Sequence, residues 1–342
     1  MSIAARTARA RGGRSPVALA LVLLFIAFNA TVDLYWGRHA HELPALAAQG
    51  APIARVFQSF AVADRGYFDH VTKAELGLYI LNSTLTLGLL LCLLAALLRR
   101  WRIRVPLQII TGGCMAYQVL SYWWCALLGG FPAMDEKTLG HFALFVAGGL
   151  PWLLGGGYLA WDGAKVAVAA LERLGGGSGL RNLGANERAS LSVIAFFAVI
   201  AYTLELLWLY HAFDWPLQTG FWANMARYYG MGDRAYWDQP SYFEVGLESF
   251  NVFFIVSSEL WLGYAILRRR AYRWPLELCI GGFLTYSVIY YFTVKIAFPQ
   301  MFTQDIASYA MLIVPNLPWL FGGAWWIWDA GGTILKAVRG AD

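Results

Sequence analysis

Two glutamates in apolar surroundings are the residues of this sequence best suited to acid–base chemistry. Glu205 lies within the apolar run Ala-Tyr-Thr-Leu-Glu-Leu-Leu-Trp, and Glu248 follows Glu244 by four residues at the head of another such run. Side chains four residues apart share one face of a helix, and Asn251 continues that face. Ionisable groups inside a membrane-length helix are costly, usually face the interior of a helix bundle and usually carry function.

Two buried carboxyl groups can divide a reaction between them, because desolvation and mutual repulsion keep one protonated while the other stays charged. Such a pair can protonate an alkene, stabilise the carbocation and remove a different proton. It is equally suited to binding a cationic amine, or to joining two helices by a hydrogen bond. We predict Glu205 and Glu248 as the catalytic pair, with Asn316 contributing an amide from a third apolar run.

Aromatic side chains crowd the same apolar runs, and inside a bundle their faces could stabilise a carbocation or an ammonium. The residues predicted to contact the substrate are Glu244, Asn251, Asn316, Trp208, Tyr286, Tyr290 and Trp319. Three further charges fall in apolar runs, and one of them, Glu277, is expected to pair with the basic turn before it. Glu259 faces the same way as Glu248 and extends the polar path, and Lys295 is expected to reach toward the membrane surface.

The composition places the chain in a membrane. Of its 342 residues, 59% are hydrophobic and only 14% are charged, whereas soluble domains carry about 25% charged residues. The net charge of +5 fits membrane topology better than nucleic-acid binding. No Cys-x-x-Cys pair, phosphate-binding loop or dinucleotide fingerprint occurs, so neither a metal nor a cofactor is predicted.

The pattern predicts an all-α integral membrane protein with eight transmembrane helices. The predicted spans are 16–36, 74–98, 105–128, 141–161, 190–211, 243–267, 274–297 and 306–329. Arginine and lysine gather before the first span, after the eighth, and in every second connection. By the positive-inside rule both termini are cytoplasmic. The membrane would be the inner membrane of a bacterium or the endoplasmic reticulum of a eukaryote.

The chain contains a tandem duplication. Glu75-Leu-Gly matches Glu244-Val-Gly, and Asp64-Arg-x-Tyr matches Asp233-Arg-x-Tyr, both at a spacing of 169 residues. We therefore predict a first four-span repeat over 1–174, a glycine-rich linker over 175–189 and a second four-span repeat over 190–342. Both repeats have an even number of spans, so they share one orientation.

The first repeat lacks part of the candidate site. Where the second repeat has Glu205, Glu248 and Asn316, the first has Asp33, Tyr79 and Gly149. One acid is kept, while the second acid and the amide are lost. The sequence thus predicts chemistry in the second repeat and a degenerate or accessory site in the first.

The second repeat, from about residue 200 to 330, resembles the emopamil-binding protein family. These are the sterol Δ8–Δ7 isomerases, whose four-helix unit is called the EXPERA domain. The resemblance rests on the order and spacing of Gly232-Asp-x-x-Tyr, Phe243-x-Val-x-x-Glu248 and Asn316-x-x-Trp. The first repeat resembles the family more weakly. The resemblance implies a tandem EXPERA-like protein that binds a sterol- or isoprenoid-like lipid.

In these isomerases two glutamates and a histidine surround the ring double bond of the sterol. Glu205 and Glu248 take the positions of the glutamates and Asn316 that of a pocket asparagine, but the histidine position is Ala201. The implied function is a membrane-embedded isomerase that shifts a lipid double bond by acid–base carbocation chemistry. Ala201 keeps a non-catalytic lipid or cationic-amine binder or transporter open, and terpenoid cyclisation is a further alternative.

Overall fold

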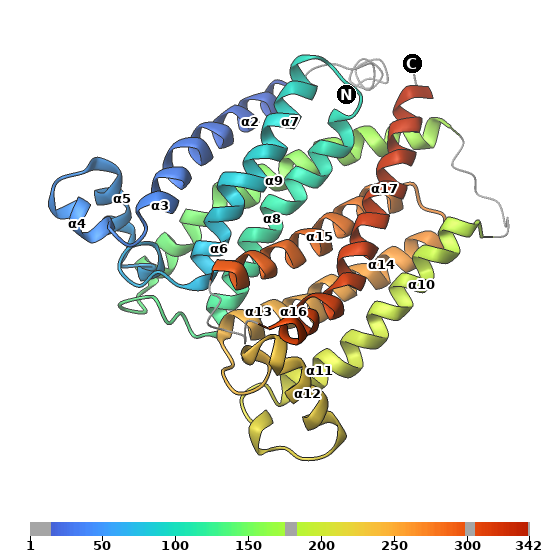
Figure 1. Ribbon diagram of the computed structural model, residues 1–342. Coiled ribbons are helices and arrows are strands. Elements are labelled where there is room, and N and C mark those ends of the chain that lie inside the picture. The colour runs from blue at the N-terminus through green and yellow to red at the C-terminus, as the bar shows by residue number, and fades with distance from the viewer. Residues whose placement is uncertain (1–14, 175–182, 298–304, 341–342) are drawn as a thin grey trace.

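The computed structural model describes residues 15–174, 183–297 and 305–340, and these ranges are helical with no strand (Figure 1). The basic arm before residue 15 and linker residues 175–182 lie outside the described residues. Seven helices within the described ranges are long and apolar enough to cross a membrane: Pro16–His39, Glu75–Leu98, Leu139–Arg173, Ala185–Tyr210, Tyr242–Leu267, Arg273–Ile296 and Ile306–Gly340. The protein is thus an all-α, multi-pass membrane protein.

The third predicted span, 105–128, forms a helix that is not among these seven. It is α8, Arg104–Leu128, and it carries Gln108, Thr111, Gln118 and Ser121 in buried positions. These polar residues lower its hydropathy. They are accommodated because α8 packs against α9, α13 and α15, so other helices cover the face on which they lie.

The first half of the chain runs from α2 to α9. Its remaining elements are α2 (Pro16–Phe28), a π-helical turn (Asn29–Asp33), α3 (Leu34–His39), α4 (Leu43–Ala48), α5 (Pro52–Phe60), a 3₁₀ turn (Arg65–Tyr67), α6 (Lys73–Leu81), a second π-helical turn (Asn82–Thr86), α7 (Leu87–Leu98) and α9 (Leu139–Arg173). Pro16 begins α2 at a position where its missing N–H costs nothing, and Ser15 Oγ caps the helix by accepting from Ala18 N–H at 3.2 Å.

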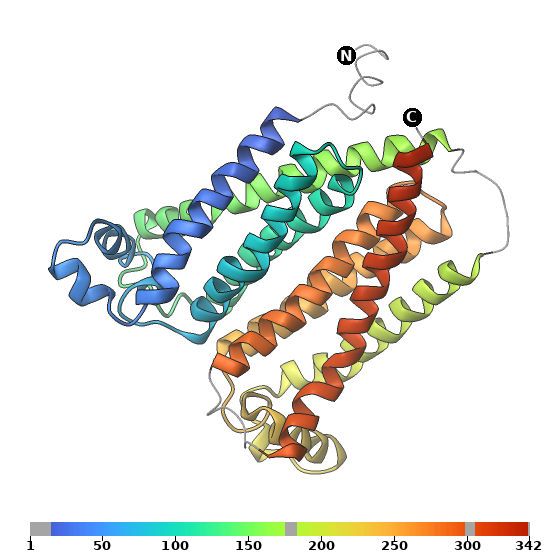
Figure 2. The ribbon, with the colours of Figure 1, turned by 45° about the horizontal axis from the view of Figure 1, so that its top comes forward.

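The second half runs from α10 to α17. Its elements are α10 (Ala185–Ile200), a π-helical turn (Ala201–Glu205), α11 (Leu206–Tyr210), a 3₁₀ turn (Trp215–Leu217), α12 (Phe221–Gly232), a 3₁₀ turn (Arg234–Tyr236), α13 (Tyr242–Phe250), a π-helical turn (Asn251–Ile255), α14 (Val256–Leu267), α15 (Arg273–Ala297), α16 (Ile306–Ile313), a 3₁₀ turn (Val314–Asn316) and α17 (Leu317–Gly340). In Figures 1 and 2 the blue-to-green helices and the yellow-to-red helices form two neighbouring bundles.

Four π-helical turns among the described residues interrupt membrane helices, and each of them carries at least one polar residue. Asp33 and Glu205 each end such a turn, whereas Asn82 and Asn251 each begin one. A π-turn inserts an extra residue into the helix and shifts the face on which later side chains lie, and such turns occur often at functional sites. Each turn therefore lets one helix present different faces to its bundle above and below the interruption.

Glycines bring backbones into contact within each half. A Cβ on Gly112 would lie 2.3 Å from Gly156 O of α9, and a Cβ on Gly281 would lie 2.7 Å from Gly323 O of α17. No side chain fits at either contact. The pairs α8–α9 and α15–α17 are consequently packed backbone to backbone, which is how small residues bring membrane helices together.

The contacts between the two halves are reciprocal. A Cβ on Gly77 would lie 2.4 Å from Val294 Cγ2, and a Cβ on Gly246 would lie 2.5 Å from Cys125 Sγ. Gly77 and Gly246 match at the spacing of 169, as do Cys125 and Val294. Reciprocity of this kind is the property of a twofold interface, and it places α6, α8, α13 and α15 at the centre of the molecule.

Two membrane helices extend well beyond their predicted ends. The predictions 141–161 and 306–329 end near Trp161 and Asp329, whereas α9 continues to Arg173 and α17 to Gly340. The extensions are amphipathic, and their apolar sides meet in one cluster that includes Ala167, Leu171, Ile334 and Val338. A predicted span ends where the continuous apolar run ends. Packing between the two helices keeps them helical beyond that point.

Candidate functional site

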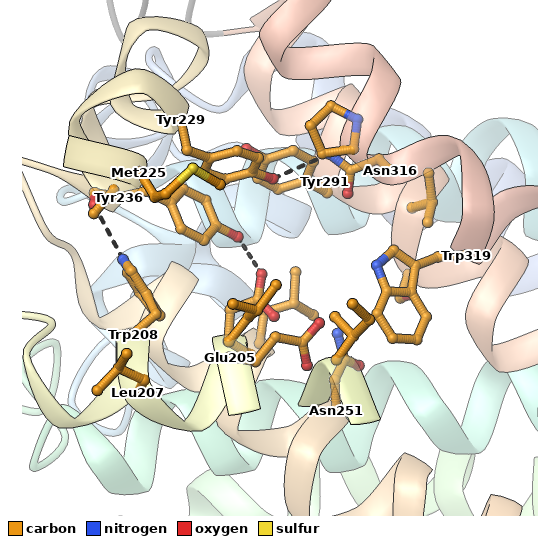
Figure 3. A pocket seen from close by; sticks show the side chains of 18 of the residues that line it. Glu205, Leu207, Trp208, Met225, Tyr229, Tyr236, Asn251, Tyr291, Asn316 and Trp319 are labelled. Carbon is orange, nitrogen blue, oxygen red and sulfur yellow. Dashed lines mark hydrogen bonds between the residues drawn. The ribbon is translucent and has the colours of Figure 1, made fainter. Parts of the chain in front are cut away.

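The second half encloses a cavity of about 530 Å³ between its helices (Figure 3). Its lining comes from the helices on either side of the π-turns at Ala201–Glu205 and Asn251–Ile255, and from α12, α15, α16 and α17. The residues that line it include Leu204, Glu205, Leu207, Trp208, Met225, Tyr229, Tyr236, Leu247, Glu248, Asn251, Glu259, Ser287, Tyr291, Asn316 and Trp319. Most are apolar or aromatic, with few polar groups, the lining typical of small-molecule sites.

Glu205 reaches the cavity from the end of its π-turn. Its Oε2 atom is buried and has no hydrogen-bond partner among the residues described. A buried polar atom without a partner costs free energy, so such atoms usually meet a ligand or water. Figure 3 shows Glu205 beside Asn251, with Trp319 across the cavity.

Glu248 lines the same cavity from α13 and differs from Glu205 in its hydrogen bonding. The phenol of Tyr236 donates a hydrogen bond to Glu248 Oε1. Tyr236 is buried and held in turn by its neighbours: Trp208 Nε1–H donates to Tyr236 O at 3.1 Å, and the two rings lie 4.6 Å apart. A donated hydrogen bond stabilises a carboxylate, so the structure gives the two acids unequal environments.

The two predicted amides also face this cavity. Asn251 Oδ1 is buried without a partner in the described part of the chain. Asn316 Nδ2 donates to Leu312 O at 2.8 Å and lies 3.3 Å from the Tyr229 hydroxyl. The 3₁₀ turn at Val314–Asn316 interrupts the helix between α16 and α17, and Asn316 lies at its end.

Trp208 and Trp319 form aromatic walls of the cavity. Trp319 stacks on Phe197 with ring centroids 4.0 Å apart, which fixes its plane. Glu205, Glu248, Asn251, Asn316, Trp208 and Trp319 thus line one cavity. They come from three of the four membrane-spanning segments of the second half.

Glu244 does not line this cavity. Its carboxylate is fully buried in an ion pair, with Lys295 Nζ 2.7 Å from Glu244 Oε1 and 2.6 Å from Asp233 Oδ2. The expectation that Lys295 reaches the membrane surface was wrong, since its side chain is fully buried. Glu244 and Glu248 are four residues apart in α13, but Lys295, 51 residues away, binds the Glu244 carboxylate outside the cavity, so the prediction that Glu244 contacts the substrate was wrong.

Tyr286 and Tyr290 also lie outside the cavity lining. Gln118 Nε2–H donates a hydrogen bond to the Tyr286 hydroxyl, so Tyr286 joins the two halves. Tyr290 packs against Phe243, with ring centroids 5.2 Å apart, and against Gly77 of the first half. Both tyrosines lie on the α15 face that meets the first half, which a single-helix pattern does not reveal.

Several lining residues were not predicted as part of the site. Tyr229 and Met225 belong to α12, a helix outside the membrane spans, and Tyr236 belongs to the turn that follows it. The duplication relates one of them to a cavity-lining residue of the first half. Tyr229 corresponds to Phe60 at the spacing of 169, and Phe60 lines a cavity in the first half.

That first-half cavity is smaller, about 290 Å³. Asp33, Tyr79, Asn82 and Gly149 line it, at the positions that correspond to Glu205, Glu248, Asn251 and Asn316. The Tyr79 ring stacks on Trp36 with centroids 4.0 Å apart. An aromatic pair therefore occupies the region that in the second half holds Glu248.

Comparisons of the chain with protein-family models, with curated proteins and with solved structures gave no match. Among the residues described, no group of three or more His, Cys, Asp and Glu side chains is placed to hold a metal ion.

Proposed function

We propose that the second half binds a sterol- or isoprenoid-like lipid in its cavity and shifts a double bond of that lipid. One observation carries the proposal: two carboxyl groups in unequal environments line one largely apolar cavity of about 530 Å³. Pockets for small molecules range over roughly 300–1,000 Å³, so the size suits one lipid of this class. The aromatic walls suit both a ring system and an isoprenoid chain.

The proposed reaction divides acid and base between the two glutamates. Glu205, whose Oε2 has no partner in the described structure, is the acid and donates its proton to one alkene carbon. The carbocation forms on the other carbon, and the faces of Trp208 and Trp319 stabilise it. Glu248, held by Tyr236, is the base and takes a proton from the adjacent carbon, so the double bond moves without net loss of atoms.

After each turnover the protonation states of Glu205 and Glu248 must be restored. A proton must pass from Glu248 back to Glu205, and Ala201 offers no imidazole for this transfer. Ala201 is fully buried and packs with Val252 and Val256, so close helix packing takes the place of a histidine. In this proposal the proton is returned through water: Glu248 releases the proton it took, and Glu205 takes up a new one from the solvent before the next turnover.

The resemblance to the emopamil-binding protein family supports the same proposal. In this proposal the chain is a pair of EXPERA-like units with eight spans and both termini cytoplasmic. The acid pair and Asn316 are supplied by the second unit. The order of elements common to both halves supports a duplicated unit, and the cavity of the second half supports its assignment as the active one.

A non-catalytic binder is the second candidate, and Ala201 is the observation that favours it. Without a histidine, the same cavity could hold a lipid or an amine whose cation lies against the carboxyl groups and aromatic faces. Such a protein would bind or transport its ligand without exchanging any proton on carbon.

Deuterium incorporation distinguishes the two candidates. The full chain in nanodiscs is incubated in heavy water with sterol and linear isoprenoid candidates, and the recovered lipid is analysed by mass spectrometry. We expect one deuterium to enter the isomerised product. Retained binding with no incorporation across these candidates would overturn the isomerase and leave the binder.

A further inference from the structure

The ion pair around Lys295 has a counterpart in the first half in which the lysine is missing. In the second half Asp233 and Glu244 bind the Lys295 ammonium, and all three side chains are buried. At the spacing of 169 their counterparts are Asp64, Glu75 and Ala126. The acids are kept, while the cation between them is replaced by a methyl group.

A separate cavity of about 230 Å³ lies where the lysine side chain would be. Asp64, Thr72, Glu75, Tyr122 and Ala126 all line it. They correspond one for one to Asp233, Ser241, Glu244, Tyr291 and Lys295. The cavity shares no lining residue with the larger lipid cavity.

The two first-half acids are buried, at 2% exposure for Asp64 and 4% for Glu75, and neutral donors hold them in place. Gly66 N–H donates to Asp64 Oδ1 at 2.9 Å, and the Tyr122 hydroxyl donates to Asp64 and lies 3.1 Å from Glu75 Oε1. The Thr72 N–H and hydroxyl donate to Glu75 Oε2. These contacts orient the carboxyl groups but bring no positive charge.

One lysine, Lys73, also lines this cavity, and the carboxyl groups that act most on its charge belong to the second half. Burial lowers the pKa of Lys73, and the carboxyl groups of Glu244 and Asp233 in the second half oppose that shift. Burial and the neighbouring Glu75 raise the pKa of Asp64 to about 7, while Tyr122 and Gly66 lower it. Two neighbouring buried carboxyl groups resist ionising together, because the charge of each raises the pKa of the other.

We propose that this cavity of about 230 Å³ binds a small primary ammonium ion on a short unbranched stem, between Asp64 and Glu75. The ammonium would lie as the Lys295 Nζ atom lies in the second half, donating to both carboxylates. The stem would follow the path of the lysine side chain past Ala126 and the apolar residues Phe131, Met134 and Phe145, which line the same cavity.

The chemistry favours an ammonium over a bare metal ion. A primary ammonium carries three donors and no acceptor, which suits two carboxylates that neutral donors already orient. The described residues offer no third His, Cys, Asp or Glu ligand at this place. A volume of about 230 Å³ also exceeds what a single ion would fill, whereas an alkyl stem would fill the apolar part.

The probe for this site is n-propylammonium, which equals the part of a lysine side chain that alanine lacks. We expect isothermal titration of the full chain in detergent to give one saturable site, and thermal unfolding to shift upward by several degrees. Propan-1-ol, which has no charge, and tetramethylammonium, which has no N–H donor, should do neither. Stabilisation by sodium or potassium chloride but not by propylammonium would overturn the proposal.

Ala126→Lys is the decisive variant, because it supplies the ammonium covalently. We expect it to unfold at a higher temperature than Ala126→Met, which adds a similar volume without charge, and to bind no propylammonium. A propylammonium response that survives Ala126→Lys unchanged would place the amine elsewhere and contradict the site.

Two further variants keep the test decisive if Ala126→Lys does not fold. The double change Asp64→Asn with Glu75→Gln retains the size of both side chains and should abolish the response. Lys295→Ala opens the matching space in the second half and should raise the stoichiometry from one site to two. A response left intact by the double amide change would refute the assignment to these carboxyl groups.

Discussion

The two halves of this protein keep the same scaffold and differ in what that scaffold encloses. Several contacts occur in both halves at corresponding positions. Trp36 Nε1–H donates to Tyr67 O at 2.8 Å, and Trp208 Nε1–H donates to Tyr236 O at 3.1 Å. The Arg65–Asp69 and Arg234–Asp238 pairs are both 2.7 Å long.

The contents differ at a handful of positions inside that scaffold. The second half has Glu248 and a cavity of about 530 Å³, while the first has Tyr79 and a cavity of about 290 Å³. The second half neutralises its buried acid pair with Lys295, and the first has Ala126 there. The comparison teaches that the fold tolerates these exchanges, so function has to be argued from the residues of each site.

The largest expected effect is that of Glu248→Gln on the proposed isomerisation. Glutamine keeps the size and hydrogen bonding of the side chain, so a neutral lipid should still bind. It cannot take up a proton, so turnover should fall by about 10²–10⁴-fold. The measurement is deuterium incorporation in nanodiscs beside a direct binding assay.

Asp33→Asn is the matched control for that change, because Asp33 is the acid kept in the first half. We expect its turnover to stay within a few-fold of the unchanged chain. A loss of turnover as large as that of Glu248→Gln would show that both halves take part in one reaction. It would contradict the assignment of catalysis to the second half alone.

Removal of the Lys295 cation should be the largest stability effect. Lys295→Met leaves two buried carboxyl groups without their cation, and breaking a buried pair in this way costs about 3–5 kcal/mol. Thermal unfolding in detergent measures the loss, with Lys137→Met at an exposed position as control. An equal, small effect of both changes would contradict the ion pair.

The glycine contacts between the halves should give an intermediate effect. Gly77→Ala and Gly246→Ala each place a Cβ 2.4–2.5 Å from an atom of the other half, and overpacking costs roughly 1–3 kcal/mol. Reciprocal contacts predict similar losses for the two changes. Gly157→Ala, with nothing within 4 Å, is the control and should be neutral or slightly stabilising.

The exposed ion pairs after the 3₁₀ turns should give the smallest effect. Hydrogen bonds from Arg65 lower the pKa of Asp69, and Arg234 does the same for Asp238. Their contribution is present above the unfolded pKa, near 4, and is lost as the pH falls through the folded value. Asp69→Asn and Asp238→Asn should each cost less than about 1 kcal/mol at pH 7, and unequal losses would show that the two turns are not equivalent.

The sequence by itself determined the class of the protein and the position of its membrane helices. Continuous hydropathy of about 20 residues is a local property, so the spans could be located without knowing their neighbours. A polar residue inside an apolar run can likewise be identified from the sequence alone. This is how we selected Glu205, Glu248 and Asn316. The duplication at a spacing of 169 residues was also found from the sequence alone, by comparing its two halves.

Only the tertiary structure decided which polar groups meet. Glu244 and Glu248 look alike in sequence, yet one binds Lys295 and the other accepts from Tyr236 while lining the cavity. Their partners come from elements far along the chain or from the loop before the helix. Burial of a charge is settled by such distant partners, since an unpaired charge in a low-dielectric interior costs too much free energy to remain there.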